Sequence, residues 1–233
     1  MPLKKWIDST NNAIEGILTA AKHERHVRYH LYAAALVLIF SYAVGVTTLE
    51  FLIISILTIF VITAELLNTA IETVVDLICP HINEQARIAK DVAAGAVLIS
   101  AVGSAIAGYI ILFPYLIRFF RRGLSITPHG SNEIAVLSVI IVLILVVLLK
   151  SLSSKKGHPL RGGFPSGHAA LSFSAWVSIT IITHNLIVSV LSFIGALALA
   201  KSRLETRTHT IWEVIAGALL GAVATYLLSI ILK

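Results

Sequence analysis

The chain has 233 residues, of which 57% are hydrophobic and 13% are charged, and its formal net charge at pH 7 is +6. Soluble domains carry roughly 25% charged residues, so this composition excludes an ordinary soluble protein and predicts an integral membrane protein. The single cysteine, Cys79, excludes an intrachain disulfide and a thiolate metal cluster. The basic residues lack the interleaved aromatic side chains of a nucleic-acid-binding patch, so we expect no nucleic-acid partner.

Residues 2–28 come first in chain order. Trp6, Ile14 and Leu18 recur near helical spacing among charged and amide side chains. This pattern predicts an amphipathic helix at the membrane interface. The segment lacks the apolar core and small-residue cleavage site of a signal peptide.

Six later stretches are long and apolar enough to cross a hydrocarbon core, which takes roughly 20 residues. One of them, 169–200, is too long for a single crossing, and His184 with Asn185 interrupts it, so we divide it in two. The predicted spans are 30–48, 50–75, 92–117, 132–149, 169–182, 186–200 and 211–232. The sequence therefore predicts an all-α integral membrane protein, with an amphipathic N-terminal helix and about seven transmembrane helices in two helical bundles.

The stretch RFFRRGLSITPHGS, 118–131, interrupts the apolar pattern with charge, Gly and Pro. We take it as a linker between a domain over 1–117 and a domain over 132–233. With seven spans and an inside amino terminus, most Lys and Arg residues fall in cytoplasmic loops, where positive charge accumulates. We expect a multi-pass protein of the cell's inner (cytoplasmic) membrane, with the candidate sites of both domains at the cytoplasmic face.

The run VITAELLNTAIETVVDLI places polar residues in an otherwise apolar helix. Glu65, Asn68, Glu72 and Asp76 fall within an arc of about 80° when each residue turns the helix by about 100°. An ionised group that faces lipid costs about 2.5–3.5 kcal/mol. The shared face is therefore predicted to meet a site, a cation or another helix.

Glu24, Lys90 and Asp91 fall where the chain re-enters the same interface. Carboxylates, an amide and a lysine are what Mg²⁺ and a nucleotide phosphate require, because hard cations take oxygen ligands and an ammonium neutralises phosphate. The expected chemistry is phosphoryl transfer. Two other interpretations stay open: an interhelical hydrogen-bond network that only fixes packing, and an ion or proton pathway.

The order Glu24, AELLNTAIETVVD and AKD resembles the small prokaryotic diacylglycerol kinase and undecaprenol kinase family over about residues 1–117. The chain has no GxxxxGK loop, which agrees with that family. The resemblance implies three membrane helices behind an amphipathic one, and a homotrimer with sites shared between subunits. It also implies ATP and Mg²⁺ as cofactors. The implied roles are Glu24 and Glu72 as metal ligands, Glu65 as catalytic base for the lipid hydroxyl, and Asn68, Asp76, Lys90 and Asp91 as ATP-binding residues.

A second polar group lies in the other half of the chain. GGFPSGHAAL, 162–171, holds His168 in a Gly- and Pro-rich loop, and SRLETRTHTIWEV carries Arg203, His209 and Glu213. If the two intervening spans form a hairpin, both segments meet at one face. Cationic side chains would then hold a phosphoryl group while one imidazole attacks phosphorus and the other protonates the departing oxygen.

These residues are similar to the type 2 phosphatidic acid phosphatase family over about residues 130–233, because PSGH is intact and SRLETRTH keeps the spacing of the later motif. The chain departs from the family in having Gly162 in place of proline, a shorter interval between Lys155 and Arg161, and Glu213 in place of aspartate. The resemblance implies a catalytic His209 that forms a phosphohistidine, His168 as general acid, Glu213 as the group that orients His209, and no cofactor. The implied phosphate binders are Lys155, Arg161, Ser166, Gly167 and Arg203.

A kinase and a phosphatase that act on the same lipid would run a futile cycle. An isoprenoid carrier removes the conflict, because phosphorylation of undecaprenol and hydrolysis of undecaprenyl pyrophosphate both yield undecaprenyl phosphate. We therefore predict a bifunctional membrane lipid enzyme of this kind. Two alternatives stay open: a diacylglycerol kinase fused to a phosphatidate or phosphatidylglycerol phosphate phosphatase, and a membrane scaffold or regulator with degenerate sites.

Overall fold

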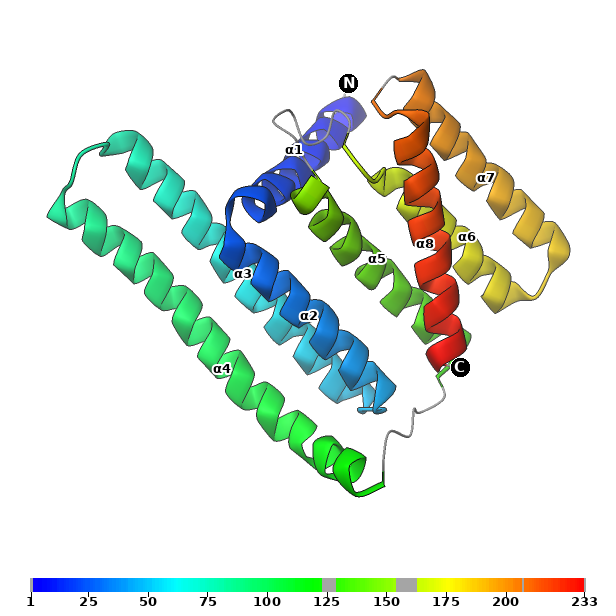
Figure 1. Cartoon of the computed structure of the whole chain (residues 1–233), viewed down its shortest axis with the longest axis horizontal. Coiled ribbons are helices and arrows are strands. Elements are labelled where there is room, and N and C mark those ends of the chain that lie inside the picture. Colours follow the sequence, from blue (N-terminus) through cyan, green and yellow to red (C-terminus); the bar gives the residue numbers. More distant parts are fainter. Residues whose placement is uncertain (1, 123–128, 154–162, 207, 233) are drawn as a thin grey trace. The chain divides into compact units, whose positions relative to one another are not determined.

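The computed structural model describes residues 2–122, 129–153, 163–206 and 208–232, and these ranges contain helices joined by short connections and no strand (Figure 1). The described helices are α1 (Pro2–His23), α2 (Arg25–Ala43), α3 (Thr48–Ile78), α4 (Glu84–Arg122), α5 (Ser131–Ser153), α6 (Gly167–Thr183), α7 (Leu186–Glu205) and α8 (Ile211–Leu232). The prediction of an all-α fold is confirmed for this part of the chain.

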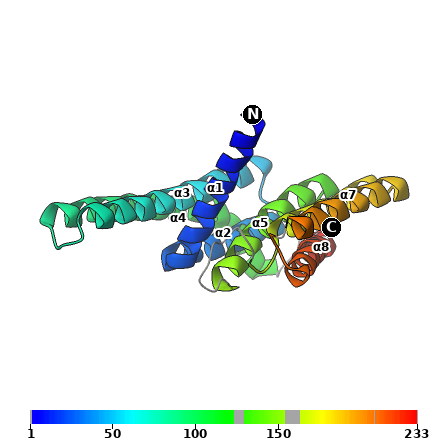
Figure 2. The same cartoon turned by 90° about the horizontal axis from the view of Figure 1, so that it is seen from above.

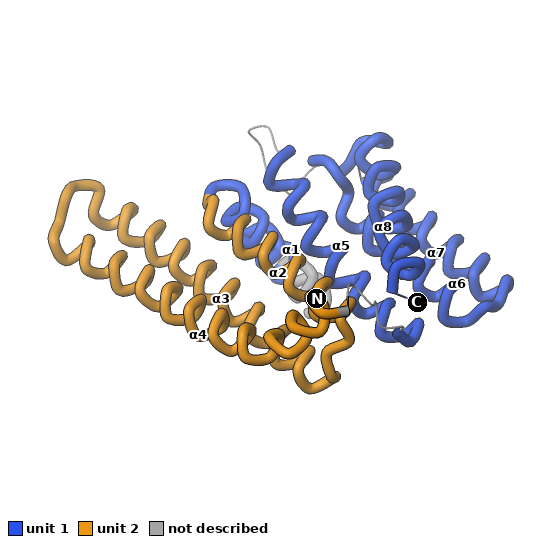
Figure 3. Tube along the Cα trace, turned by 60° about the horizontal axis from the view of Figure 1, so that its bottom comes forward, with its two compact units in different colours: residues 1–23, 127–233 blue, residues 24–126 orange. Residues whose placement is uncertain are grey.

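The helices form two compact units, coloured separately in Figure 3. Unit 2 comprises residues 24–126 and holds α2, α3 and α4. Unit 1 comprises residues 1–23 and 127–233, and holds α1 together with α5 to α8. Helix α1 therefore packs within unit 1, against α5, whereas the domain predicted over residues 1–117 places it with the residues of unit 2.

Unit 2 is built on two long helices, α3 and α4, which lie side by side in Figures 1 and 2. The start of α3 is fixed by a capping box in which Thr47 and Glu50 bind each other's backbone N–H groups. Tyr115 of α4 donates a hydrogen bond to Glu50 at 2.6 Å, which ties the two helices together at this end. Helix α4 includes Pro114 and continues through Arg122, beyond the end of the predicted span at 117.

Unit 1 is organised by close packing of α6 against α8. Gly221 lies against the backbone of Ala170, and one turn further along both helices Ser174 and Thr225 join their hydroxyl groups at 2.6 Å. Contacts that advance together along both helices mean that α6 and α8 run in the same direction. Small residues at this spacing let helix backbones approach closely.

A tight connection joins α6 to α7. Helix α6 ends at Thr183, His184 adopts a left-handed conformation with φ 47°, and Asn185 caps α7 by accepting hydrogen bonds from the backbone N–H groups of Ile187 and Val188. Asparagine at a helix start satisfies N–H groups that have no partner within the helix. The predicted break at His184 and Asn185 is confirmed.

Five of the described helices are long and apolar enough to cross a membrane: α3, α4, α5, α7 and α8. Helix α6 is also apolar but has 17 residues. The chain is therefore a multi-pass membrane protein. The total of seven spans and the interfacial location of α1 stay predictions.

Candidate functional sites

The first site lies along α3 in unit 2. Glu65 is buried, with 5% of its surface exposed, although it is an ionisable residue in an apolar helix. One turn further on, Asn68 donates a hydrogen bond from Nδ2 to Glu72 Oε1 at 3.0 Å. The Oδ1 atom of Asn68 is buried and accepts no hydrogen bond from the described residues. Buried polar atoms are almost always paired, so this oxygen marks a place suited to a donor or a cation.

Helix α4 brings further charges to the same end of α3. Lys90 forms an ion pair with Asp76 at 2.5 Å, and Asp91 forms one with Arg87 at 2.9 Å. Exposed ion pairs of this kind contribute about 0–1 kcal/mol, so Lys90 can exchange its carboxylate partner for a phosphate. Sequence reasoning missed Arg87, which could have been found from its position one helical turn before Asp91.

Glu24 occupies the position immediately before α2 and makes no capping hydrogen bond with its side chain. Within the described ranges, no group of three or more His, Cys, Asp or Glu side chains is arranged to hold a metal ion. Asn68 Oδ1 and the neighbouring Glu72 do supply oxygen donors side by side, which is the donor type that Mg²⁺ takes. The donor chemistry of Asn68 and Glu72 would therefore suit Mg²⁺.

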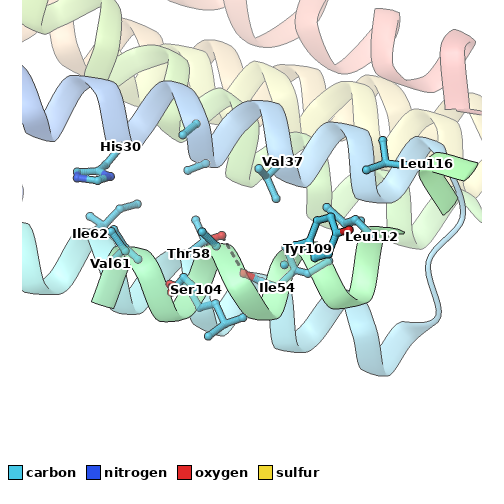
Figure 4. A pocket seen from close by; sticks show the side chains of 16 residues that line it. His30, Val37, Ile54, Thr58, Val61, Ile62, Ser104, Tyr109, Leu112 and Leu116 are labelled. Atoms are coloured by element: carbon cyan, nitrogen blue, oxygen red, sulfur yellow. Dashed lines mark hydrogen bonds between the residues drawn. The ribbon is translucent and has the colours of Figure 1, made fainter. Parts of the chain in front are cut away.

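An apolar groove of about 420 Å³ lies between α2, α3 and α4 of unit 2. Figure 4 shows His30 and Ile62 at one end of the groove and Leu116 at the other. The lining on α4 extends from residue 101 to residue 116, which is about 22 Å at 1.5 Å per residue and covers most of a roughly 30 Å hydrocarbon core. Glu65 lies one turn of α3 beyond Ile62, so the groove leads toward the carboxylates.

The second site lies in unit 1, where α8 begins. His209 Nδ1 lies 3.0 Å from Glu213 Oε2, and 4% of the His209 side chain is exposed. Burial lowers the pKa of His209 below its usual value, against the opposing effect of the bond to Glu213. A neutral imidazole that donates from Nδ1 to a carboxylate keeps the Nε2 lone pair available for attack.

His168, the second residue of α6, faces the same place. Burial lowers its pKa from 6.5 to about 4, together with the electrostatic influence of the neighbouring Arg203, His209 and Lys150. The PSGH segment is held against α8 because the Ser166 N–H donates to the Glu213 carbonyl oxygen at 2.9 Å. The structure thus brings the two histidine motifs together, as the hairpin of α6 and α7 requires.

Lys150 is the residue of this site that sequence reasoning missed. It lies near the end of α5, is 6% exposed, and is close enough to His168, His209 and Glu213 to interact with them electrostatically. The sequence feature that could have identified Lys150 is that it is a lone lysine at the end of the long apolar run of α5. The two predicted phosphate binders Lys155 and Arg161 lie outside the described residues.

Two further polar groups at this site lack a protein partner among the described residues. Ser166 Oγ, in a residue that is fully buried, and Arg203 Nε form no hydrogen bond. Gly167 follows directly in the chain, and an added Cβ there would lie 3.1 Å from Val146, so little space remains beside the backbone. A guanidinium group, a hydroxyl group and a buried lysine around two imidazoles form a site with the chemistry of a phosphate binder.

Comparison with known proteins concerns mainly the first half of the chain. Residues 11–112 match the family described as Prokaryotic diacylglycerol kinase. An undecaprenol kinase of Bacillus subtilis (strain 168) is 42% identical over 114 residues, which are 49% of this chain and 93% of the relative. Diacylglycerol kinases of Synechocystis and Haemophilus influenzae are 35% and 32% identical over 44% and 42% of this chain, and 59% and 83% of the relatives. No solved structure matches the chain.

Proposed function

Because the chain belongs to the prokaryotic diacylglycerol kinase family, we propose that unit 2 transfers the γ-phosphoryl group of ATP to the hydroxyl group of undecaprenol. The observation that carries the proposal is the polar face of α3, where the buried Glu65 is followed by the Asn68–Glu72 pair and by Asp76 with Lys90. The relative of B. subtilis that is named an undecaprenol kinase supports the choice of lipid.

In this proposal Glu65 removes the proton from the lipid hydroxyl as that oxygen attacks the γ-phosphorus. Lys90 leaves Asp76 for the nucleotide phosphates, and Asn68, Asp76 and Asp91 orient ATP. Glu24 and Glu72 would hold Mg²⁺, and the bound cation would neutralise charge on the transferred phosphoryl group. We propose a homotrimer with shared sites as the working assembly.

The groove of unit 2 is proposed to hold the hydrocarbon tail of the lipid. Its lining is apolar apart from a few groups such as His30, Thr58 and Ser104, and the hydroxyl groups of Thr58 and Ser104 already donate to backbone carbonyls. Such a surface accepts a hydrocarbon chain without leaving polar groups unpaired. A tail in the groove would bring the lipid hydroxyl to the turn that carries Glu65.

We propose that unit 1 is a phosphatase. His209 Nε2 attacks phosphorus and forms a P–N bond while the P–O bond to the leaving group breaks, and His168 donates a proton to that oxygen. Water then hydrolyses the phosphohistidine, with His168 taking a proton from the water. Lys150, Arg203 and Ser166 hold the phosphoryl oxygens, together with Lys155, Arg161 and the Gly167 N–H, and bound phosphate favours the protonated form of His168.

The two activities are proposed to converge on undecaprenyl phosphate, from undecaprenol in one case and from undecaprenyl pyrophosphate in the other. Both sites are proposed to face the cytoplasm. The second candidate is a diacylglycerol kinase joined to a glycerolipid phosphatase, and the relatives named diacylglycerol kinase favour it.

One experiment separates the two candidates. Purified full-length protein in mixed micelles receives Mg²⁺, γ-labelled ATP and equal amounts of undecaprenol and diacylglycerol. We expect label mainly in undecaprenol, and separately we expect faster hydrolysis of undecaprenyl pyrophosphate than of undecaprenyl monophosphate. Label mainly in diacylglycerol, or faster hydrolysis of the monophosphate, overturns the convergent scheme.

A further inference from the structure

Glu213 contacts both histidine segments of unit 1. Its Oε2 atom bonds His209 Nδ1 at 3.0 Å and accepts a hydrogen bond from the Thr210 N–H at 3.0 Å. Its Oε1 atom accepts a hydrogen bond from the Gly163 N–H at 3.0 Å, across 50 residues of sequence. The backbone carbonyl of Glu213 also accepts the Ser166 N–H at 2.9 Å. One residue therefore holds His209 on one side and both ends of the segment 163–166 on the other.

The carboxylate of Glu213 contacts one set of residues on its own chain segment, His209 and Thr210, and one residue on a distant segment, Gly163. His209 and Thr210 lie on the same chain segment as Glu213, within four residues, so a shorter carboxylate on α8 still has them nearby. Gly163 belongs to a separate segment, and its φ of 100° directs the backbone into a conformation that favours glycine. Removing one methylene from Glu213 withdraws the carboxylate toward its own backbone by about one carbon–carbon bond, roughly 1.5 Å. This movement takes it away from Gly163 on the other segment, by more than that hydrogen bond tolerates, while His209 and Thr210 stay beside it on its own segment.

We propose that Glu213 is a positioning residue with two separable tasks: it orients His209, and through Gly163 it fixes the segment 163–166 that leads into His168. The nucleophile and the phosphate-binding segment are thereby set by one carboxylate. This inference rests on the proposed phosphatase activity of unit 1. It extends that proposal because it gives a role to the methylene group that glutamate has in addition to aspartate: the longer side chain reaches Gly163 and places the segment 163–166.

Two substitutions in the full-length protein separate the tasks. Glu213→Asp keeps the charge beside His209 but withdraws from Gly163, so KM for undecaprenyl pyrophosphate and Kd for vanadate should rise by about tenfold, with kcat within about threefold. Glu213→Gln keeps the length and an acceptor for Gly163 but removes the charge that supports His209. In that variant kcat should fall by at least about 100-fold, with Kd for vanadate within about threefold. Glu205→Gln, an exposed change in the same unit, is the matched control and should match the wild type.

Hydrogen exchange measured on the peptide that contains residues 163–166 tests the placement without relying on activity. We expect faster exchange in Glu213→Asp and wild-type protection in Glu213→Gln. Gly163→Ala, which strains the segment without touching His209, should reproduce the rise in vanadate Kd seen for Glu213→Asp. Equal protection and equal vanadate Kd in Glu213→Asp and the wild type overturn the inference. A wild-type protein that neither binds vanadate nor hydrolyses the lipid overturns the proposed phosphatase, while the exchange result still decides whether Glu213 places the segment.

Discussion

A Cβ atom added to Gly221 of α8 would lie 1.8 Å from the carbonyl oxygen of Ala170 in α6. The two helices therefore meet backbone to backbone at this level, and no side chain larger than hydrogen fits between them. The same contact holds the start of α6, which carries His168, beside the start of α8, which follows His209. Helix packing and the geometry of the proposed phosphatase site are consequently linked.

We expect Gly221→Ala to destabilise unit 1 by about 1–3 kcal/mol, because an overpacked contact between backbones has no flexible side chain that can move aside. Phosphatase turnover should fall as α6 and α8 separate, and kinase turnover should stay unchanged. Thermal unfolding and both assays check this. Gly195→Ala in α7 is the matched control, since its added Cβ meets nothing within 4 Å. Equal stability of the two variants would contradict the packing argument.

Glu72→Gln should reduce kinase turnover by at least about 100-fold, because a neutral amide binds Mg²⁺ more weakly than a carboxylate does, and the cation is what neutralises phosphate charge. Phosphatase turnover should be unaffected. Both rates are measured on the same protein preparation, so that a misfolded fraction would lower both of them equally. Glu84→Gln, an exposed change on α4, is the control. Parallel loss of both activities in Glu72→Gln would mean that the two sites are not separable.

His209→Ala should abolish the acid-labile phosphoenzyme that forms when the protein is quenched during hydrolysis of labelled substrate. The reason is that the alanine side chain offers no nitrogen to accept the phosphoryl group. Kinase turnover should remain at the wild-type level. His184→Asn, an exposed change that tolerates the left-handed backbone of residue 184, should keep full labelling. If His209→Ala were still labelled, a residue other than His209 would be the nucleophile.

Gly108→Leu should fill the groove of unit 2. The position lines the groove, and an added Cβ there meets nothing within 4 Å, so the larger side chain enters open space without straining the backbone. We expect KM for a long-chain prenol to rise by about tenfold or more, with a smaller rise for a short-chain alcohol. Gly103→Leu on the same helix has equal room but does not line the groove. The same KM for both variants would exclude the groove as the tail site.

Stability should depend on pH through His168. Its pKa is 6.5 in an unfolded chain and about 4 in the folded protein, so between these values the unfolded state binds the extra proton. The free energy of unfolding therefore falls as pH is lowered from about 6.5 toward 4. Thermal unfolding midpoints in detergent across this range should decline less steeply for His168→Asn than for the wild type. Identical slopes would contradict the buried environment assigned to His168.

The membrane class, the helical fold, the polar face of α3 and the break at His184 were predictable from sequence, because composition and helical periodicity are local properties. Residues 11–112 carry enough of these local signals to identify the family. The pairing of the PSGH segment with the His209 segment was predictable as well, since a hairpin of two spans returns the chain to the same side.

Only the tertiary structure decided three other features. It packs α1 against α5 within unit 1, directs Lys150 toward the histidines, and gives Glu213 a second partner in Gly163. Each depends on contacts between segments far apart in the chain. A periodic pattern indicates which side chains share a face, but which neighbour covers that face is settled by how the helices pack together.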